Sequence, residues 1–109
     1  PFRPMDRNAR KFLFDLLGTP SPTGFEVAGQ RVWKGYVEKF ADAVESDAYG
    51  TTWATIRGSG RAPRKVMLEA HADEIGFMVK QINAEGFLRV DRIGGSDVAT
   101  ARGRRCRTT

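Results

Sequence analysis

The chain has 109 residues, of which 40% are hydrophobic and 28% are charged, a composition typical of one globular domain. It shows no apolar run of about 18 residues that could span a membrane and no secretory signal, so we expect no membrane partner. Its single cysteine, Cys106, cannot form an internal disulfide, which favours a reducing, cytoplasmic compartment. One cysteine and one histidine also exclude a zinc finger.

The net charge of +5 is concentrated near the C-terminal end. Four arginines without an acidic neighbour lie in the last eight residues: Arg102, Arg104, Arg105 and Arg107. Subtracting these four leaves +1 for residues 1–101, so the rest of the chain is nearly neutral. A short basic end is more often solvated than functional, and we expect no nucleic-acid partner. Because the chain begins with Pro1 and stops directly after a strand-like alternation, we expect a fragment.

Apolar residues at helical spacing predict two helices in the N-terminal part of the chain. The first covers residues 6–17, with Asp6 as its N-cap and Gly18 as a left-handed C-terminal residue. Thr23 and Glu26 have the spacing of a capping box that opens the second helix. The expected buried stripe of this second helix consists of Ala28, Val32, Trp33, Tyr36, Val37 and Phe40.

Beyond the second helix the hydrophobic period changes to two, which predicts strands. Turn residues then separate short β-rich runs, and one mostly apolar run suits a strand covered on both faces. In chain order we expect a hairpin (44–46 with 51–57), a buried strand (65–70), a second hairpin (75–82 with 87–93) and the beginning of another strand (104–108). Two helices followed by strands indicate an α/β or α+β layout.

The segment His71-Ala72-Asp73-Glu74 is the one most suggestive of chemistry, because it follows the predicted strand 65–70. If strand geometry continues, His71 and Asp73 point to the same side, about 6.6 Å apart along the chain, at the strand end where open α/β sheets bind ligands. A neutral imidazole can bind zinc while a carboxylate orients the ring through its other nitrogen. His71 is thus a candidate metal ligand and Asp73 a candidate catalytic residue that orients it, with Glu74 adding negative charge. The plain alternative is a histidine that only hydrogen-bonds to its neighbour.

Four segments in chain order carry a further pattern. They are LLGTPSPTGFE at 16–26, DAYG at 47–50 before a β run, VMLEAHADEIGFMV at 66–79, and GFLRV with IGGSD at 86–97. These segments resemble the N-terminal part of the M42 family of metallo-aminopeptidases, which are described as glutamyl aminopeptidases or, in some genomes, as cellulases. The resemblance covers most of residues 13–97. Thr51 stands where the family usually has Asn, and Ala72 where it has Met, a packing change that leaves the ligand chemistry intact.

The resemblance implies an α/β fold: the N-terminal part of an α/β/α zinc-exopeptidase catalytic domain in residues 1–73, running into an inserted β-rich, barrel-like domain in residues 74–109. It also implies peptide substrates, large hollow homo-oligomers and two divalent metal ions, zinc or cobalt. His71 corresponds to the first metal ligand and Asp73 to the aspartate that orients it.

The family's other ligands and catalytic glutamates lie further downstream, and each zinc needs roughly three protein ligands. We therefore expect the full-length protein to be a metal-dependent aminopeptidase and this 109-residue segment alone to be inactive.

Three alternatives remain open. A zinc exopeptidase of the M20 or M18 type also uses a His-x-Asp triplet, although the DEIGFMV continuation and the IGG loop disfavour it. A non-catalytic binding module would use the arginine-rich end and the hairpins as a docking surface. A cellulase would need a positioned pair of carboxylic acids, and no spacing in this chain singles out such a pair.

Overall fold

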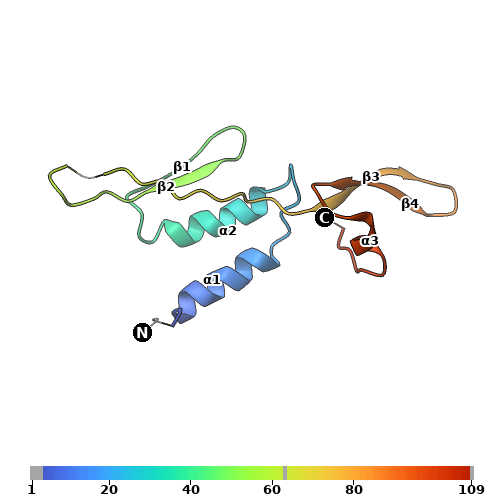
Figure 1. The fold of residues 1–109 in the computed structure, drawn as a ribbon, viewed down its shortest axis with the longest axis horizontal. Helices are drawn as coiled ribbons and strands as arrows, with labels where there is room; N and C mark the ends of the chain where they lie inside the picture. The colour runs from blue at the N-terminus through green and yellow to red at the C-terminus, as the bar shows by residue number, and fades with distance from the viewer. Residues whose placement is uncertain (1–3, 63, 109) are drawn as a thin grey trace.

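The fold is a mixed α/β arrangement with two separate hairpins, seen in a computed structural model that describes residues 4–62 and 64–108. Helix α2 lies between helix α1 and the hairpin β1–β2, whereas the hairpin β3–β4 lies at the opposite end of the molecule (Figure 1). No helix in the described part of the chain is long and apolar enough to cross a membrane. The elements are α1 (Arg7–Gly18), α2 (Val27–Val37), β1 (Ala43–Ser46), β2 (Thr52–Thr55), β3 (Gly76–Ile82), β4 (Leu88–Ile93) and the short α3 (Val98–Ala101).

Helix α1 begins as predicted and ends differently. The Asp6 carboxylate accepts hydrogen bonds from the backbone N–H groups of Asn8 and Ala9, both at 2.8 Å, which confirms it as the N-cap. The prediction of a left-handed conformation at Gly18 is wrong. Gly18 is the last helical residue, and Thr19 is the C-cap, with φ −90° and ψ 118°. A residue before proline is driven out of the helical region, and Pro20 therefore sets this end.

The predicted capping box at the start of α2 is also wrong. The helix begins at Val27 after Glu26, which makes no side-chain cap. The Glu26 carboxylate instead accepts a hydrogen bond from the Gly24 N–H at 2.7 Å, in a turn where Gly24 has φ +89°. The Thr23 hydroxyl donates to the Asp73 carboxylate, 50 residues further along the chain, at 2.6 Å. The helix begins too late for Thr23 to lie at its N-cap, and the hydroxyl proton is bound by a carboxylate, which is a strong acceptor because it is charged.

Aromatic side chains hold α1 against α2. The rings of Phe12 and Tyr36 are stacked, with centroids 4.0 Å apart, and Phe40 meets Tyr36 edge-on at 5.6 Å. Val37 is buried, and three further members of the predicted stripe are half-buried: Val32, Trp33 and Tyr36. Ala28 and Phe40 are exposed, so the stripe was predicted too broadly. These two residues lie at the ends of the stripe, where no other described element covers them.

Both predicted hairpins are confirmed. Strands β1 and β2 pair in antiparallel register from Ala43–Thr55 to Ser46–Thr52, and the Asp47 carboxylate accepts two backbone hydrogen bonds in the turn. Strands β3 and β4 pair in the same sense, with an irregularity between Val79 and Gln81. These contacts are local in sequence, which is why alternation and turn residues suffice to predict them.

Two predicted strands do not form. Residues 65–70 and 104–108 run without strand pairing, and Leu68 in the first of them is 95% exposed. A covered central strand needs hydrogen-bonding neighbours, and the described residues place none beside it. The helix α3, capped by Asp97, was not predicted because it is only four residues long.

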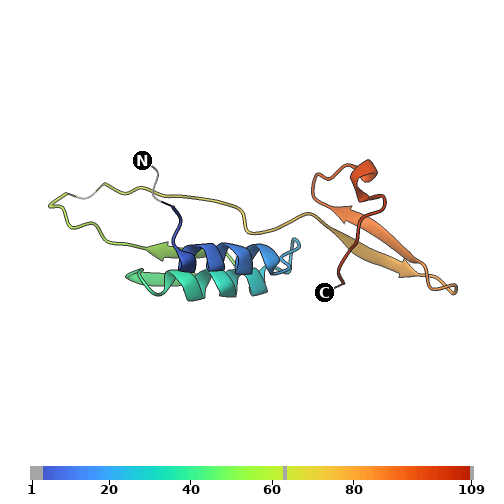
Figure 2. The same ribbon diagram turned by 90° about the horizontal axis from the view of Figure 1, so that it is seen from below.

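The described chain is elongated and encloses very little core. Its radius of gyration is 18.6 Å, whereas a compact domain of this length has about 13 Å. Its accessible surface is 10351 Å², against about 6,000 Å² for a compact protein of 12.1 kDa. Figure 2 shows that the hairpin β3–β4 lies apart from α1, α2 and the hairpin β1–β2. An extended segment that leads into β3 joins the two parts. Most large apolar side chains of the described residues are therefore exposed rather than packed in a core.

Candidate metal site

The candidate site forms where the loop between α1 and α2 meets the segment that precedes β3. The loop and this segment form a parallel bridge at Pro22 and Glu74. The Glu74 N–H donates to the Ser21 carbonyl oxygen at 2.9 Å, and the Ser21 N–H donates to the Glu74 carboxylate at 2.9 Å. The Ser21 hydroxyl donates to the Ala72 carbonyl oxygen at 2.8 Å, and Ser21 is only 7% exposed. These contacts fix the site segment on the loop.

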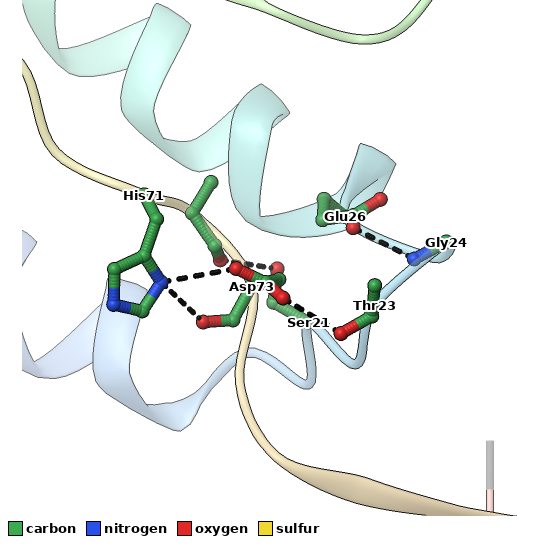
Figure 3. A network of polar contacts seen from close by, with 7 residues as sticks. Ser21, Thr23, Gly24, Glu26, His71 and Asp73 are labelled. Atoms are coloured by element: carbon green, nitrogen blue, oxygen red, sulfur yellow. Dashed lines mark hydrogen bonds and ion pairs between the residues drawn. The ribbon is translucent and has the colours of Figure 1, made fainter. Parts of the chain in front are cut away.

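His71 and Asp73 lie side by side, although the strand expected before them is absent. The Nδ1 atom of His71 is 3.0 Å from Asp73 Oδ1 and 2.9 Å from the Asp73 carbonyl oxygen (Figure 3). Both of these oxygens are acceptors, so the neutral ring carries its proton on Nδ1. The lone pair then resides on Nε2, which points away from Asp73. The His71 side chain is 85% exposed, leaving that nitrogen open to a ligand.

The Asp73 carboxylate is held by a different group at each oxygen. Oδ1 faces the His71 ring, and Oδ2 accepts the Thr23 hydroxyl at 2.6 Å. The hydrogen bond from Thr23, followed by that from His71, lowers the pKa of Asp73 below its ordinary value of 3.8. Asp73 is therefore ionised at neutral pH. It can accept a hydrogen bond from the His71 Nδ1–H without being protonated itself.

The residues present fit one corner of a metal site. A neutral imidazole with its Nδ1–H on a carboxylate is the usual arrangement of a histidine ligand to zinc or a similar ion. No group of three or more potential ligands occurs among residues 4–62 and 64–108. Glu74, which was expected to add negative charge near the site, is engaged with the Ser21 backbone. His71 can thus supply one ligand of a metal site.

Sequence analysis missed the contacts of Ser21 and Thr23, because Ser21 was given no role of its own and Thr23 was considered only as part of a capping box. They lie about 50 residues from the segment that they contact. The motif Pro-Ser-Pro-Thr was the available signal. It places two hydroxyl groups in a loop that needs only turn-forming residues, which indicates a hydrogen-bonding role for them. A local pattern cannot identify the acceptor of a long-range hydrogen bond.

The chain is similar to known aminopeptidases. The family of M42 glutamyl aminopeptidases matches residues 50–109. A lysyl aminopeptidase of Pyrococcus furiosus is 41% identical over 81 residues, which are 73% of this chain and 22% of that protein. A glutamyl aminopeptidase of Lactococcus lactis is 31% identical over 97 residues, 85% of this chain and 27% of that protein.

A solved structure is similar as well. The crystal structure of a TET aminopeptidase from a marine sediment archaeon of the Thaumarchaeota superposes with a TM-score of 0.72 at 33% identity. The match covers 83% of this chain and 25% of that chain. The present chain thus spans about a quarter of the length of the relatives that it matches. The family match also decides against the M20 and M18 alternatives. On these grounds the chain belongs to the M42 glutamyl aminopeptidase family.

Proposed function

We propose that the protein carrying this chain is a metal-dependent aminopeptidase that removes N-terminal residues from peptides. One observation supports this most directly: the His71 Nδ1–H is held by Asp73, which leaves Nε2 available as a ligand at an exposed position. Membership of the M42 family and the names of the relatives supply the reaction class. Both observations point to hydrolysis of peptides rather than to glycoside cleavage or a purely binding role.

In this proposal the site requires two divalent metal ions, zinc or cobalt. When bound, such ions supply Lewis acidity toward a peptide carbonyl and a water of lowered pKa. His71 contributes Nε2 as one ligand. Asp73 keeps the proton on Nδ1 and fixes the ring plane, which is the catalytic contribution expected of it from the sequence. Asp73 thus acts through His71 and does not need to touch the substrate.

We also propose that residues 1–73 belong to an α/β/α catalytic domain and that residues 74–109 begin an inserted β-rich domain. The hairpin β3–β4 supports this boundary, because it extends away from α1 and α2 (Figures 1 and 2). The two parts meet at the bridge between Pro22 and Glu74, directly after the site. A homo-oligomer in the cytoplasm completes the proposal, supported by the exposed apolar residues and by a single cysteine, Cys106.

The test is replacement of His71 by alanine in the intact protein. We expect the metal content after dialysis to fall, and kcat/KM for an aminoacyl-anilide with zinc or cobalt to drop by more than about 100-fold, since even outer-shell partners of a ligand are worth 10–100-fold. The control is Tyr49→Ala, which removes a ring that is 97% exposed in the turn of β1–β2. Wild-type turnover in the His71 variant would refute the assignment of the ligand, and a wild-type protein without metal-dependent turnover would refute the enzyme.

A further inference from the structure

We propose that Thr23 is a positioning residue, which fixes the Asp73 carboxylate and thereby the orientation in which His71 presents Nε2. This inference rests on the proposed function, since it assigns a task within the same metal site. It extends the site from two neighbouring residues to a third one, 50 positions earlier in the chain. Thr23 lies in the loop before α2, so the orientation of the ligand depends on an element that holds no ligand itself.

The geometry of the carboxylate carries the argument. Asp73 Oδ2 accepts the Thr23 hydroxyl at 2.6 Å, and Oδ1 lies 3.0 Å from His71 Nδ1 (Figure 3). With one partner on each oxygen, the carboxylate cannot rotate about its Cβ–Cγ bond without stretching one of the two contacts. Without the Thr23 hydroxyl, only the histidine contact restrains this rotation. The Asp73 side chain is 38% exposed, so water would then compete for both oxygens.

The backbone around Thr23 is itself anchored to the site segment. Ser21 is buried and makes three hydrogen bonds to Ala72 and Glu74, on either side of Asp73. These contacts fix the position of the loop relative to residues 72–74 and place the Thr23 hydroxyl next to Asp73. If the Thr23 hydroxyl served only to hold the loop and the site segment together, it would repeat what Ser21 already does. The distinct feature of Thr23 is that it contacts the carboxylate that faces the ligand.

Three variants of the intact protein test the proposal. Thr23→Val keeps the shape and removes the hydroxyl, Thr23→Ser keeps the hydroxyl, and Thr19→Val removes a comparable hydroxyl that donates to the Asp15 carbonyl oxygen at 2.7 Å. We expect the affinity for zinc, titrated against a competing chelator, to fall about tenfold in Thr23→Val, at the low end for outer contacts of a ligand. Thr23→Ser should restore it to within about twofold, and Thr19→Val should leave it unchanged.

A metal-free crystal structure of the Thr23→Val variant supplies the second readout. We expect the carboxylate to rotate, so that the distance from His71 Nδ1 to Asp73 Oδ1 exceeds the hydrogen-bond range, about 3.2 Å. An unchanged distance together with unchanged zinc affinity would overturn the proposal, as would a Thr23→Ser variant as weak as Thr23→Val. If the wild type binds no metal, the proposed function fails, and the metal-free distances alone decide whether Thr23 positions Asp73.

Discussion

At the scale of single residues, the site consists of three side chains, two of which donate hydrogen bonds to the third. The Thr23 hydroxyl and the His71 Nδ1–H both donate to Asp73, which only accepts. His71 and Asp73 could be predicted from the sequence, because residues two apart are close in any extended segment. Thr23 could not, because its partner is set by how the loop folds back onto residues 72–74.

Replacing Asp73 by asparagine should show whether the accepting character matters. The amide can present its NH₂ group to His71, which moves the ring proton to Nε2 and blocks the nitrogen proposed as the ligand. We expect the zinc affinity of the intact protein to fall about 10–100-fold, measured by chelator competition. The matched control is Asp91→Asn, which removes an exposed carboxylate paired with Lys80. Equal affinities of the two variants would contradict this role of Asp73.

At the scale of elements, helix α2 approaches the buried Ser21 at Gly29. A Cβ atom at Gly29 would lie 3.1 Å from the Ser21 hydroxyl oxygen, which is tighter than ordinary contact. Gly35 in the same helix has nothing within 4 Å of such an atom. The two glycines therefore separate helix propensity from packing on the loop.

Alanine at these two positions should have different effects on the free energy of unfolding. Gly35→Ala should stabilise the intact protein by about 0.5–1 kcal/mol, because glycine is a poor helix former. Gly29→Ala should lose that gain, since displacing the Ser21 hydroxyl from Ala72 costs about 1 kcal/mol. Urea unfolding of both variants measures the difference, and a Gly29→Ala variant as stable as Gly35→Ala would show that the loop does not pack closely on α2.

The elements also show where sequence patterns are sufficient. Helices α1 and α2 and both hairpins were predicted, because their periodicity and turn residues act within a few positions. The segment 65–70 has the composition of a covered strand but does not pair, since strand formation depends on neighbours that the local sequence does not specify. The predicted start of α2 was wrong because the chain turns at Gly24, where φ is +89°, and the helix begins only at Val27.

At the scale of the whole molecule, the described chain is an open scaffold that presents one side of the proposed metal site. Apolar side chains such as Leu17, Phe77 and Val90 remain 41–71% exposed, and the surface area is far above that of a compact domain. The candidate site has the same character, with one candidate histidine ligand and no cluster of three potential ligands in residues 4–62 and 64–108. That these 109 residues alone are inactive stays a prediction.

Anomalous diffraction from crystals of the intact, zinc-loaded protein tests the central claim most directly. At the zinc edge, we expect a peak about 2.1 Å from Nε2 of His71, with Nδ1 still in contact with Asp73. A peak on Nδ1, or no peak within reach of the His71 ring in a protein that hydrolyses aminoacyl-anilides, would contradict the account.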